Sequence, residues 1–476
     1  MEKTPTPYPR FEYQSIWIFI STFILVVGCA ETPNLEQSSS AESSRENITL
    51  NIWWEKGFNL EEDEAFSALV DNWSQKTNYK TKLSFYTTSE LSEKADRAVQ
   101  GNKLPDIMMS RKAEITLYPR LAWQGKLADV SDIIEPVQDL YEENALEAVT
   151  YYNQVENKHS FYGVPLYQTS FHIFYWQKLL ASINYTQKDI PQDWDNFWQF
   201  WQQAQDKLRA KKSDNIYGLG LPLSNASMDT FFLFEQVLEA YDINLLDSEG
   251  QLLIDTPQVR QRIIKCLDWY NQFYQQGYIP PDAIDWLNTD NNRHLLNRFV
   301  LMTPNATLSI PASVRQDQDT YYNKLGIVNF PRKPSGEPMR YVVSIKQAII
   351  FADSPHQQIA KQFLRYLIQP ETIAAYLQAS GNRYLPVHKS VWKKSSWQQT
   401  TDPYIATATK ALTKSQTRLI YEAKNPAYSQ VLQENIWGKA LTSMIIDGMT
   451  AEQAADQAIT RIKQIFAEWK SQELSK

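Results

Sequence analysis

Apolar positions in the first part of the chain alternate between the period of a strand and that of a helix. Residues 48–54 alternate apolar and polar side chains, and residues 66–73 then carry an apolar stripe at helical spacing. The same sequence of patterns follows at 79–86 (strand), 91–98 (helix) and 106–110 (strand). Strands that alternate with helices of this length form parallel βαβ units, which predicts an α/β fold. Such sheets bind ligands at the carboxyl ends of their strands.

A different pattern begins after residue 160. Residues 169–175 are apolar and predict one strand, and Asp193 is a predicted N-cap of the helix that follows. Trp194, Trp198 and Trp201 recur on one face of that helix. A helix seam packed on a sheet explains these tryptophans better than a ligand-binding stripe does.

The rest of the chain predicts further α/β structure. The patterns indicate helices at 230–241, 259–274 and 355–368, and strands at 325–330 and 341–351. Residues Thr450 to Gln453 form a capping box at the start of a long closing helix. No fixed-period repeat is visible.

Composition and charge narrow the function classes. The chain carries a net charge of −7 and no long Lys/Arg cluster, so we expect no nucleic-acid partner. The five histidines have no metal-ligand spacing, and we expect neither a metal nor a cofactor. Of the two cysteines, Cys266 lies on an amphipathic pattern and is predicted to be buried. The many Trp, Tyr and Phe residues, 13% of the chain, slightly favour sugar stacking.

The N-terminal region predicts export. The apolar run 16–27 would span about 18 Å as a helix, well short of the ~30 Å membrane core, and fits a signal-peptide core. Val26-Val27-Gly28-Cys29 resembles a bacterial lipobox, which implies a signal peptide at 1–28 and a lipid on Cys29. Residues 29–47 are polar and predict a disordered tether. The alternative is an uncleaved N-terminal anchor.

Several motifs, in this order, resemble those of the extracellular solute-binding proteins of family 1, the maltose-binding-like lipoproteins of ABC transporters. They are the opening strand at 48–54, Leu104-Pro-Asp-Ile, Leu127-Ala-Asp-Val, Tyr162-Gly-Val-Pro, Pro191-Gln-Asp-Trp-Asp-Asn-Phe, the helix at 360–367 with Gln369-Pro-Glu, and residues 425–450. Each motif is weak alone, but together they cover nearly the whole mature chain.

The resemblance implies a two-lobe periplasmic-binding-protein fold (type II, Venus-flytrap) with hinge crossings. Lobe one would comprise 48–160 with 341–388, and lobe two 161–340 with 389–476. A ligand that touches both lobes would shift the population toward a closed form. The implied partners are a sugar or oligosaccharide and the permease subunits of an ABC importer in the membrane, and we expect a monomer on the periplasmic or extracellular face.

The resemblance also implies ligand-binding residues, with no catalytic ones. They are Trp53, Trp54, Glu55, Ser110, Arg111, Tyr167, Gln168, Asn305, Arg340, Tyr341, Arg383 and Trp437. Aromatic planes beside Arg, Glu and Asn groups suit the faces and hydroxyls of sugars. Because a strand alternates faces, we expect only one of the two adjacent tryptophans to face the cleft.

Two features depart from the family pattern. Asn297-Arg-Phe-Val-Leu-Met302 replaces a G-(K/R)-A-A-M segment, and Met339-Arg340-Tyr341 replaces a Gly-Gly crossing. Two other functions stay open: a lipoprotein that presents its ligand to a sensor, and a secreted carbohydrate-active enzyme. No G-x-S-x-G, HExxH or phosphate-loop motif supports an enzyme.

Overall fold

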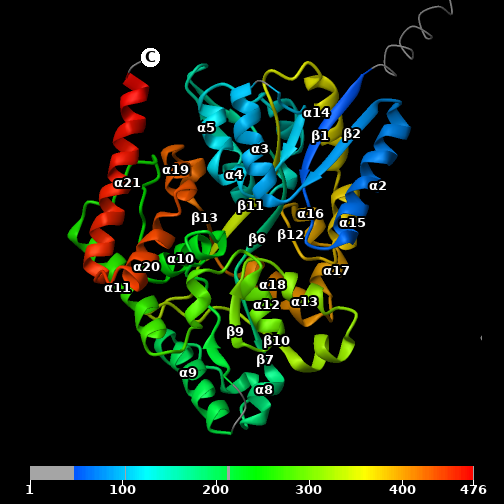
Figure 1. The fold of residues 1–476 in the computed structure, drawn as a ribbon. Helices are drawn as coiled ribbons and strands as arrows, with labels where there is room; N and C mark the ends of the chain where they lie inside the picture. The colour runs from blue at the N-terminus through cyan, green and yellow to red at the C-terminus, as the bar shows by residue number, and fades with distance from the viewer. Residues whose placement is uncertain (1–47, 102, 212–214, 475–476) are drawn as a thin grey trace, which may run out of the picture. The chain divides into compact units, whose positions relative to one another are not determined.

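Two β-sheets organise the described part of the chain (Figure 1). The structure, a computed structural model, describes residues 48–101, 103–211 and 215–474, which lie in one unit, Arg45–Lys476. The predicted signal peptide, Cys29 and nearly all of the tether therefore lie outside the described residues.

The first sheet has seven strands in the order β12-β6-β11-β3-β1-β2, with β13 paired to β11. Its strands are β1 (Thr49–Glu55), β2 (Lys80–Tyr86), β3 (Ile107–Met109), β6 (Val164–Ser170), β11 (Tyr341–Ile350), β12 (Leu385–Pro386) and β13 (Thr417–Leu419). β1 runs parallel to β2 and β3, as the alternating strand and helix patterns predict, whereas β11 runs antiparallel to β3 and β6.

The second sheet has four strands in the order β10-β7-β9-β8. They are β7 (His172–Trp176), β8 (Tyr217–Leu219), β9 (Val300–Asn305) and β10 (Leu325–Val328). A separate hairpin pairs β4 (Thr150–Asn153) with β5 (Lys158–Phe161). The prediction of a single strand at 169–175 is wrong, because this segment changes sheets at Phe171. All residues from 164 to 176 are buried, so the apolar pattern carries no sign of the break.

Helices surround both sheets. The α-helices are α2 (Leu60–Thr77), α3 (Thr88–Gly101), α4 (Ala113–Thr116), α5 (Tyr118–Trp123), α6 (Ser131–Ile134), α7 (Glu143–Glu147), α8 (Gln177–Ser182), α9 (Trp194–Ala210), α10 (Met228–Ala240), α11 (Pro257–Gln275), α12 (Asp290–Leu296), α13 (Ser309–Ser313), α14 (Gln357–Leu367), α15 (Pro370–Ala379), α16 (Lys389–Trp392), α17 (Ser395–Gln398), α18 (Pro403–Lys414), α19 (Ala427–Gln433), α20 (Ile436–Ile446) and α21 (Ala451–Leu474). Short 3-10 or π turns are η1 (Glu135–Leu140), η2 (Gln187–Asp189), η3 (Pro281–Ile284), η4 (Thr320–Lys324) and η5 (Tyr421–Ala423).

The first sheet buries both faces, because alternate side chains of a strand point to opposite sides. On one face Trp54 stacks on Phe66 of α2, with ring centroids 3.7 Å apart. On the other face Trp53 belongs to a separate apolar cluster with Leu91 and Ala95 of α3. Helices therefore cover the sheet on both sides, and its strands leave their carboxyl ends free to form a site.

Helix α9 packs on the second sheet as its sequence predicts. The side chain of Asp193 accepts a hydrogen bond from the backbone N–H of Asn196 and caps the helix. Trp194, Trp198 and Trp201 are all buried, which confirms that this stripe belongs to the core. The predictions of a buried Cys266 and of a capping box at the start of α21 are also confirmed.

The chain crosses between the sheets more than once. One crossing joins β6 to β7, a second joins β10 to β11, and a third leads from α18 into β13 of the first sheet. Strand β6 thus pairs in the first sheet, although the predicted boundary places it in lobe two. The predicted limits of the lobes stay a prediction.

Candidate functional site

A cavity of about 430 Å³ lies where residues of both sheets and their helices meet. This volume is in the range of small-molecule sites. The cavity is lined by Glu55, Lys56, Gly57, Phe58, Thr87, Thr88, Arg111, Thr169, Met228, Asp229, Phe232, Asn288, Thr289, Asn292, Asn305, Ala306, Thr307, Ser309, Lys346 and Arg383. One wall comes from the first sheet and its loops, and the other from α10, α12 and the end of β9.

Strand ends build the first wall. Glu55 is the last residue of β1, and Arg111 follows the end of β3 by two residues. Because β1 and β3 are parallel neighbours, their carboxyl ends meet at one edge of the sheet, where the fold class predicts a ligand site.

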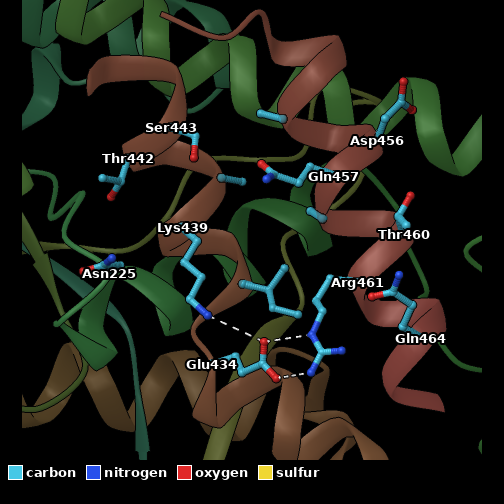
Figure 2. A pocket seen from close by; sticks show the side chains of 14 residues that line it. Asn225, Glu434, Lys439, Thr442, Ser443, Asp456, Gln457, Thr460, Arg461 and Gln464 are labelled. Atoms are coloured by element: carbon cyan, nitrogen blue, oxygen red, sulfur yellow. Dashed lines mark hydrogen bonds and ion pairs between the residues drawn. The ribbon is translucent and has the colours of Figure 1, made fainter. Parts of the chain in front are cut away.

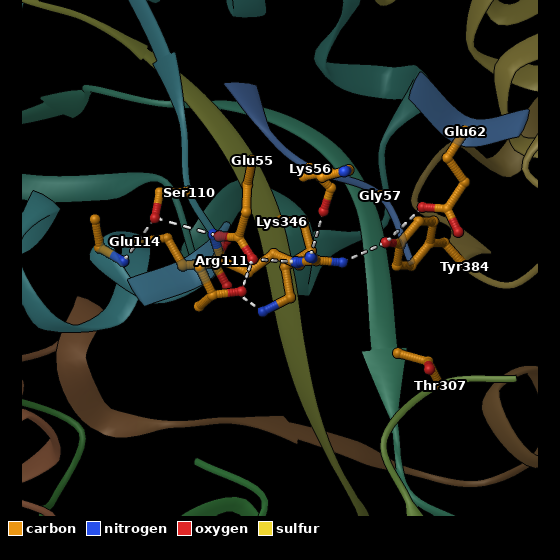
Figure 3. Close-up of polar contacts among 12 residues, drawn as sticks. Glu55, Lys56, Gly57, Glu62, Ser110, Arg111, Glu114, Thr307, Lys346 and Tyr384 are labelled. Carbon is orange, nitrogen blue, oxygen red and sulfur yellow. Dashed lines mark hydrogen bonds and ion pairs between the residues drawn. The ribbon is translucent and has the colours of Figure 1, made fainter. Parts of the chain in front are cut away.

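Glu55 and Arg111 form an ion pair in which the carboxylate is buried and the guanidinium is partly exposed (Figure 3). Arg111 donates its backbone N–H to Glu55 Oε2 at 2.6 Å and its Nε to Oε1 at 2.7 Å. Thr88 and Ser110 also donate their hydroxyls to this carboxylate. Burial raises the pKa of Glu55, but the Arg111 charge and these hydrogen bonds outweigh it and lower the pKa below its ordinary value. Glu55 is therefore an ionised carboxylate whose oxygens are already occupied.

A second ion pair, in which both side chains are buried, lies beside the first. Arg383 Nε and Nη2 donate to the two carboxylate oxygens of Glu62 at 2.6 and 2.9 Å. Tyr384 accepts a hydrogen bond from Arg111 at 2.5 Å and donates to Glu62 at 3.1 Å, so its hydroxyl links the two pairs. Arg383 Nη1 lies 3.5 Å from the Thr307 hydroxyl on the opposite wall.

A third pair is buried at the first wall, and its lysine lines the cavity. Lys346 of β11 donates to Glu114 and, at 2.9 Å, to the Ser344 hydroxyl (Figure 3). Burial raises the pKa of Glu114 to about 7, and Lys346 offsets only part of this effect. Each of these three cations is thus paired with its own carboxylate.

Side-chain amides shape the opposite wall. Asn288 accepts from the backbone N–H of Met228 at 2.7 Å and so holds the start of α10. Asn305 donates to Asn292, and Asn292 donates to the Ser309 hydroxyl at 2.9 Å. With Phe58 and Phe232 as apolar surfaces, the cavity combines hydroxyls, amides and paired charges. This lining suits an uncharged, hydroxyl-rich ligand.

Four of the residues predicted to bind ligand come together at this cavity. They are Glu55, Arg111, Asn305 and Arg383. Their roles toward a ligand stay predictions, and the structure shows that the carboxylate and guanidinium groups bind mainly one another.

The other predicted residues do not line the cavity. Trp53 and Trp54 are both buried in the faces of the first sheet, so neither tryptophan faces the cavity. Lys94 lies over the Trp53 ring, 4.2 Å from its centroid, on the α3 side. Strand alternation does send the two side chains to opposite faces, but helices cover both faces. Ser110 donates its hydroxyl to the Glu55 carboxylate but does not itself line the cavity.

The remaining predicted residues have structural partners. Tyr167 stacks on Tyr384, and the Gln168 amide donates to the Pro386 carbonyl at 2.7 Å. Trp437 stacks on Phe234, and Tyr341 starts β11. Arg340 binds Glu239 of α10 at a crossing between the sheets.

Several cavity residues were not predicted. Lys346 could have been predicted as a site residue, because it is a charged residue within β11, a strand of ten mainly apolar residues. Asp229 and Asn292 carried none, since polar residues near helix starts are common for reasons of capping. Their place at the cavity depends on the packing of α10 and α12 against β9 and β11.

A second hollow, of about 660 Å³, lies along α20 and α21 (Figure 2). Three of its charged residues pair within the groove, since Arg461 binds Glu434 at 2.6 Å and Lys439 lies 3.6 Å from the same carboxylate. The fourth, Asp456, pairs with Arg260 outside the lining. The lining comes from elements close in sequence, apart from Asn225. We refer to this hollow as the α20–α21 groove.

Comparison with known proteins decides the family. The family model of the bacterial extracellular solute-binding proteins matches residues 68–407. The chain belongs to this family. Consistent with that, YcjN of Escherichia coli (strain K12), a candidate ABC transporter periplasmic-binding protein, is 21% identical over 281 residues. That match covers 59% of this chain and 60% of YcjN, so the chain matches less than two thirds of this relative's length.

Solved structures of solute-binding proteins share the fold. An ABC transporter solute-binding protein of Thermotoga lettingae, bound with α-D-tagatose, has a TM-score of 0.72 at 20% identity, covering 88% of this chain and 100% of that one. Maltose-bound MalE3 of T. maritima has a TM-score of 0.70 at 16% identity, with the same coverage of 88% and 100%. The sugar transporter of Arthrobacter chlorophenolicus with laminaribiose gives 0.69 at 14%, covering 87% and 99%. These likenesses confirm the predicted two-lobe α/β fold.

Two other kinds of feature are absent from the described residues. None of the helices there is long and apolar enough to cross a membrane. The same residues contain no group of three or more His, Cys, Asp or Glu side chains that could hold a metal ion.

Proposed function

We propose that this solute-binding protein captures an uncharged sugar or oligosaccharide in the cavity between the two sheets and delivers it to an ABC permease. The observation that carries the proposal is the pairing of charges at the cavity. Four cations line the cavity, and three of them, Arg111, Arg383 and Lys346, are each paired with a buried carboxylate, so most of the charge at this wall is already matched and the wall mainly offers hydrogen bonds. A charged ligand would leave its own charge desolvated and unpaired.

The comparisons support the same ligand class. The three solved relatives described above are bound with tagatose, maltose and laminaribiose. A ligand that contacts both walls would stabilise a closed form, which a permease could distinguish from the open one. We further propose that the chain is exported and held at the membrane by a lipid on Cys29, and that it acts as a monomer.

Calorimetric titration of the protein with maltose, laminaribiose and tagatose tests the proposal. We expect saturable binding of at least one sugar and no hydrolysis product after prolonged incubation. Binding of none, or turnover of any, would contradict it.

A pair of phenylalanines offers a matched test of the site. Phe58 lines the cavity and is 37% exposed, whereas Phe299 is 56% exposed and lies outside it. Phe58→Ala should weaken sugar binding about tenfold, because an aromatic face contributes roughly 0.5–1.5 kcal/mol beyond its buried area. Phe299→Ala should leave affinity unchanged.

A further inference from the structure

One carboxylate of the cavity differs from the others in its surroundings. Asp229 is the second residue of α10 and lies beside Met228 and Phe232 in the cavity wall. Among the described residues, its hydrogen-bond partner is the Asn291 amide, whose Nδ2 is 3.3 Å from Oδ2. The carboxylate therefore keeps most of its capacity to accept hydrogen bonds.

On the opposite wall the Glu55 and Glu62 carboxylates are already occupied, and Glu114, whose Oε2 has no hydrogen-bond partner among the described residues, does not line the cavity. Both oxygens of Glu55 accept hydrogen bonds from Arg111 and from neighbouring hydroxyls. Both oxygens of Glu62 accept from Arg383. A ligand hydroxyl thus finds a free acceptor on the α10 wall and saturated ones across the cavity.

We infer that Asp229 contacts the ligand directly, accepts a sugar hydroxyl on the α10 wall, and thereby sets the preference for a hydroxyl-rich ligand. This inference rests on the proposed sugar-binding function. Asp229 would then be the recognition residue of the α10 wall. A ligand bound by Asp229 and by the first wall would contact both walls of the cavity.

Burial makes this carboxylate titrate near neutral pH. Desolvation raises the pKa of Asp229 to about 7, and the Asn291 hydrogen bond lowers it by less. The start of a helix favours a negative charge, but burial outweighs that effect here. Protonated and ionised forms of Asp229 are therefore both present at neutral pH.

Charged neighbours of Asp229 are mostly paired with other groups. On the elements packed near Asp229 and across the cavity, the paired groups are Asp290 with Arg293, Asp282 with His294, Lys346 with Glu114, Glu55 with Arg111, and Glu62 with Arg383. Lys56 is a further charged residue of the cavity lining. Of these groups, Glu114 also titrates near pH 7, so wild-type data alone do not identify the titrating group. Comparison with a neutral Asp229 variant does.

The sign of the pH effect follows from linkage. A hydroxyl donated to Asp229 favours the ionised form, so ligand binding releases a proton when the carboxyl is protonated. Affinity should rise as pH rises toward 7 and level off above it. With a pKa of about 7, the wild type should bind roughly tenfold more weakly at pH 6 than at pH 7.5.

The test is calorimetric titration of the full chain with maltose and with laminaribiose at pH 6 and pH 7.5. D229N should weaken binding about tenfold at pH 7.5 and lose the pH dependence, while D229E should keep it. D195N is the matched control, because Asp195 is also the second residue of its helix, α9, but is exposed. It should behave as wild type, and circular dichroism should show all variants folded.

The possible failures can be told apart. If D229N binds as tightly as wild type, or keeps the same pH dependence, the inference is overturned while the proposed function stands. If the wild type binds no sugar at either pH, the proposed function is overturned and the inference with it.

Discussion

The cavity and the α20–α21 groove are both hollows, but they are built from different parts of the chain. The groove is larger, about 660 Å³ against about 430 Å³. Yet its charges are partly exposed, with 35% and 18% of the Arg461 and Glu434 side chains accessible. The corresponding values for Arg383 and Glu62 at the cavity are 4% and 1%. Size alone therefore does not identify a ligand site.

The difference teaches that the two hollows are distinguished by the desolvation penalty of the charged side chains in their walls. A buried ion pair must overcome a large desolvation penalty, whereas a surface pair does not. The cavity wall holds two pairs that are buried on both sides and a third whose carboxylate alone is fully buried, and its lining comes from strand ends and helices of both sheets. The groove lies between consecutive helices and needs no such arrangement.

The largest expected effect on stability concerns the buried ion pair of Glu62 and Arg383. Arg383→Ala leaves Glu62 buried without its partner and should lower the free energy of unfolding by about 3–5 kcal/mol. Urea unfolding followed by circular dichroism measures it. A loss below 1 kcal/mol would mean that Glu62 regains solvent at little cost, and the contrast between the two hollows would weaken.

A blocked cavity should abolish binding, and a blocked groove should not. Ala306→Trp places an indole in the cavity wall and should weaken sugar binding at least about 100-fold by steric exclusion. Ser443→Trp does the same in the groove and should leave affinity unchanged. Equal losses in both variants would assign the ligand to the wrong hollow.

A carboxylate near the cavity and one in the groove should change protein stability with pH in opposite directions. Glu422 lies near the Lys346–Glu114 pair, and burial raises its pKa to about 8. A raised folded-state pKa contributes stability below the unfolded value near 4.5 that is lost as pH rises through about 8. Glu422→Gln should therefore match wild type near pH 5 and be more stable at pH 8.5, by on the order of 2 kcal/mol. Thermal unfolding across this range checks it, and a constant difference would contradict it.

The smallest expected effect on stability concerns the Glu434–Arg461 pair of the α20–α21 groove. Hydrogen bonds from Arg461 lower the pKa of Glu434 to about 2, so its stabilisation is present above the unfolded value near 4.5 and is lost as pH falls toward 2. Because the pair is partly exposed, Glu434→Gln should cost only about 0.2–1 kcal/mol at pH 7, and less at pH 3. Urea midpoints at both pH values and at high salt measure it, and a loss comparable to that of Arg383→Ala would remove the distinction.

Much of the fold could be predicted from local patterns. The alternation at the start of β1 matches its alternating burial, and the helical stripe of α2 is buried, so the pattern itself predicts these elements. The cap at Asp193 and the tryptophan seam of α9 are local for the same reason. The break at Phe171 was missed, because a segment buried on all sides shows no period.

The candidate site was predicted only in part. Glu55 and Arg111 could be found because strand order places the ends of β1 and β3 together. One of Trp53 and Trp54 is expected to face the cavity, but α2 and α3 cover both faces of the strand, and no local pattern reveals that covering. Lys346 stood out as a charge within an apolar strand, whereas Asp229 resembled any acidic residue in a first helical turn.

By itself the sequence determined the α/β class, the order of most elements and the resemblance to solute-binding proteins, because these depend on periodicity and on short motifs. Tertiary structure decided which charges neutralise one another and which side chains reach the cavity. Glu62 and Arg383 are separated by 321 residues, and Lys346 and Glu114 by 232. Pairings over such distances arise only when the sheets and helices pack, since burial makes an unpaired charge too costly to keep.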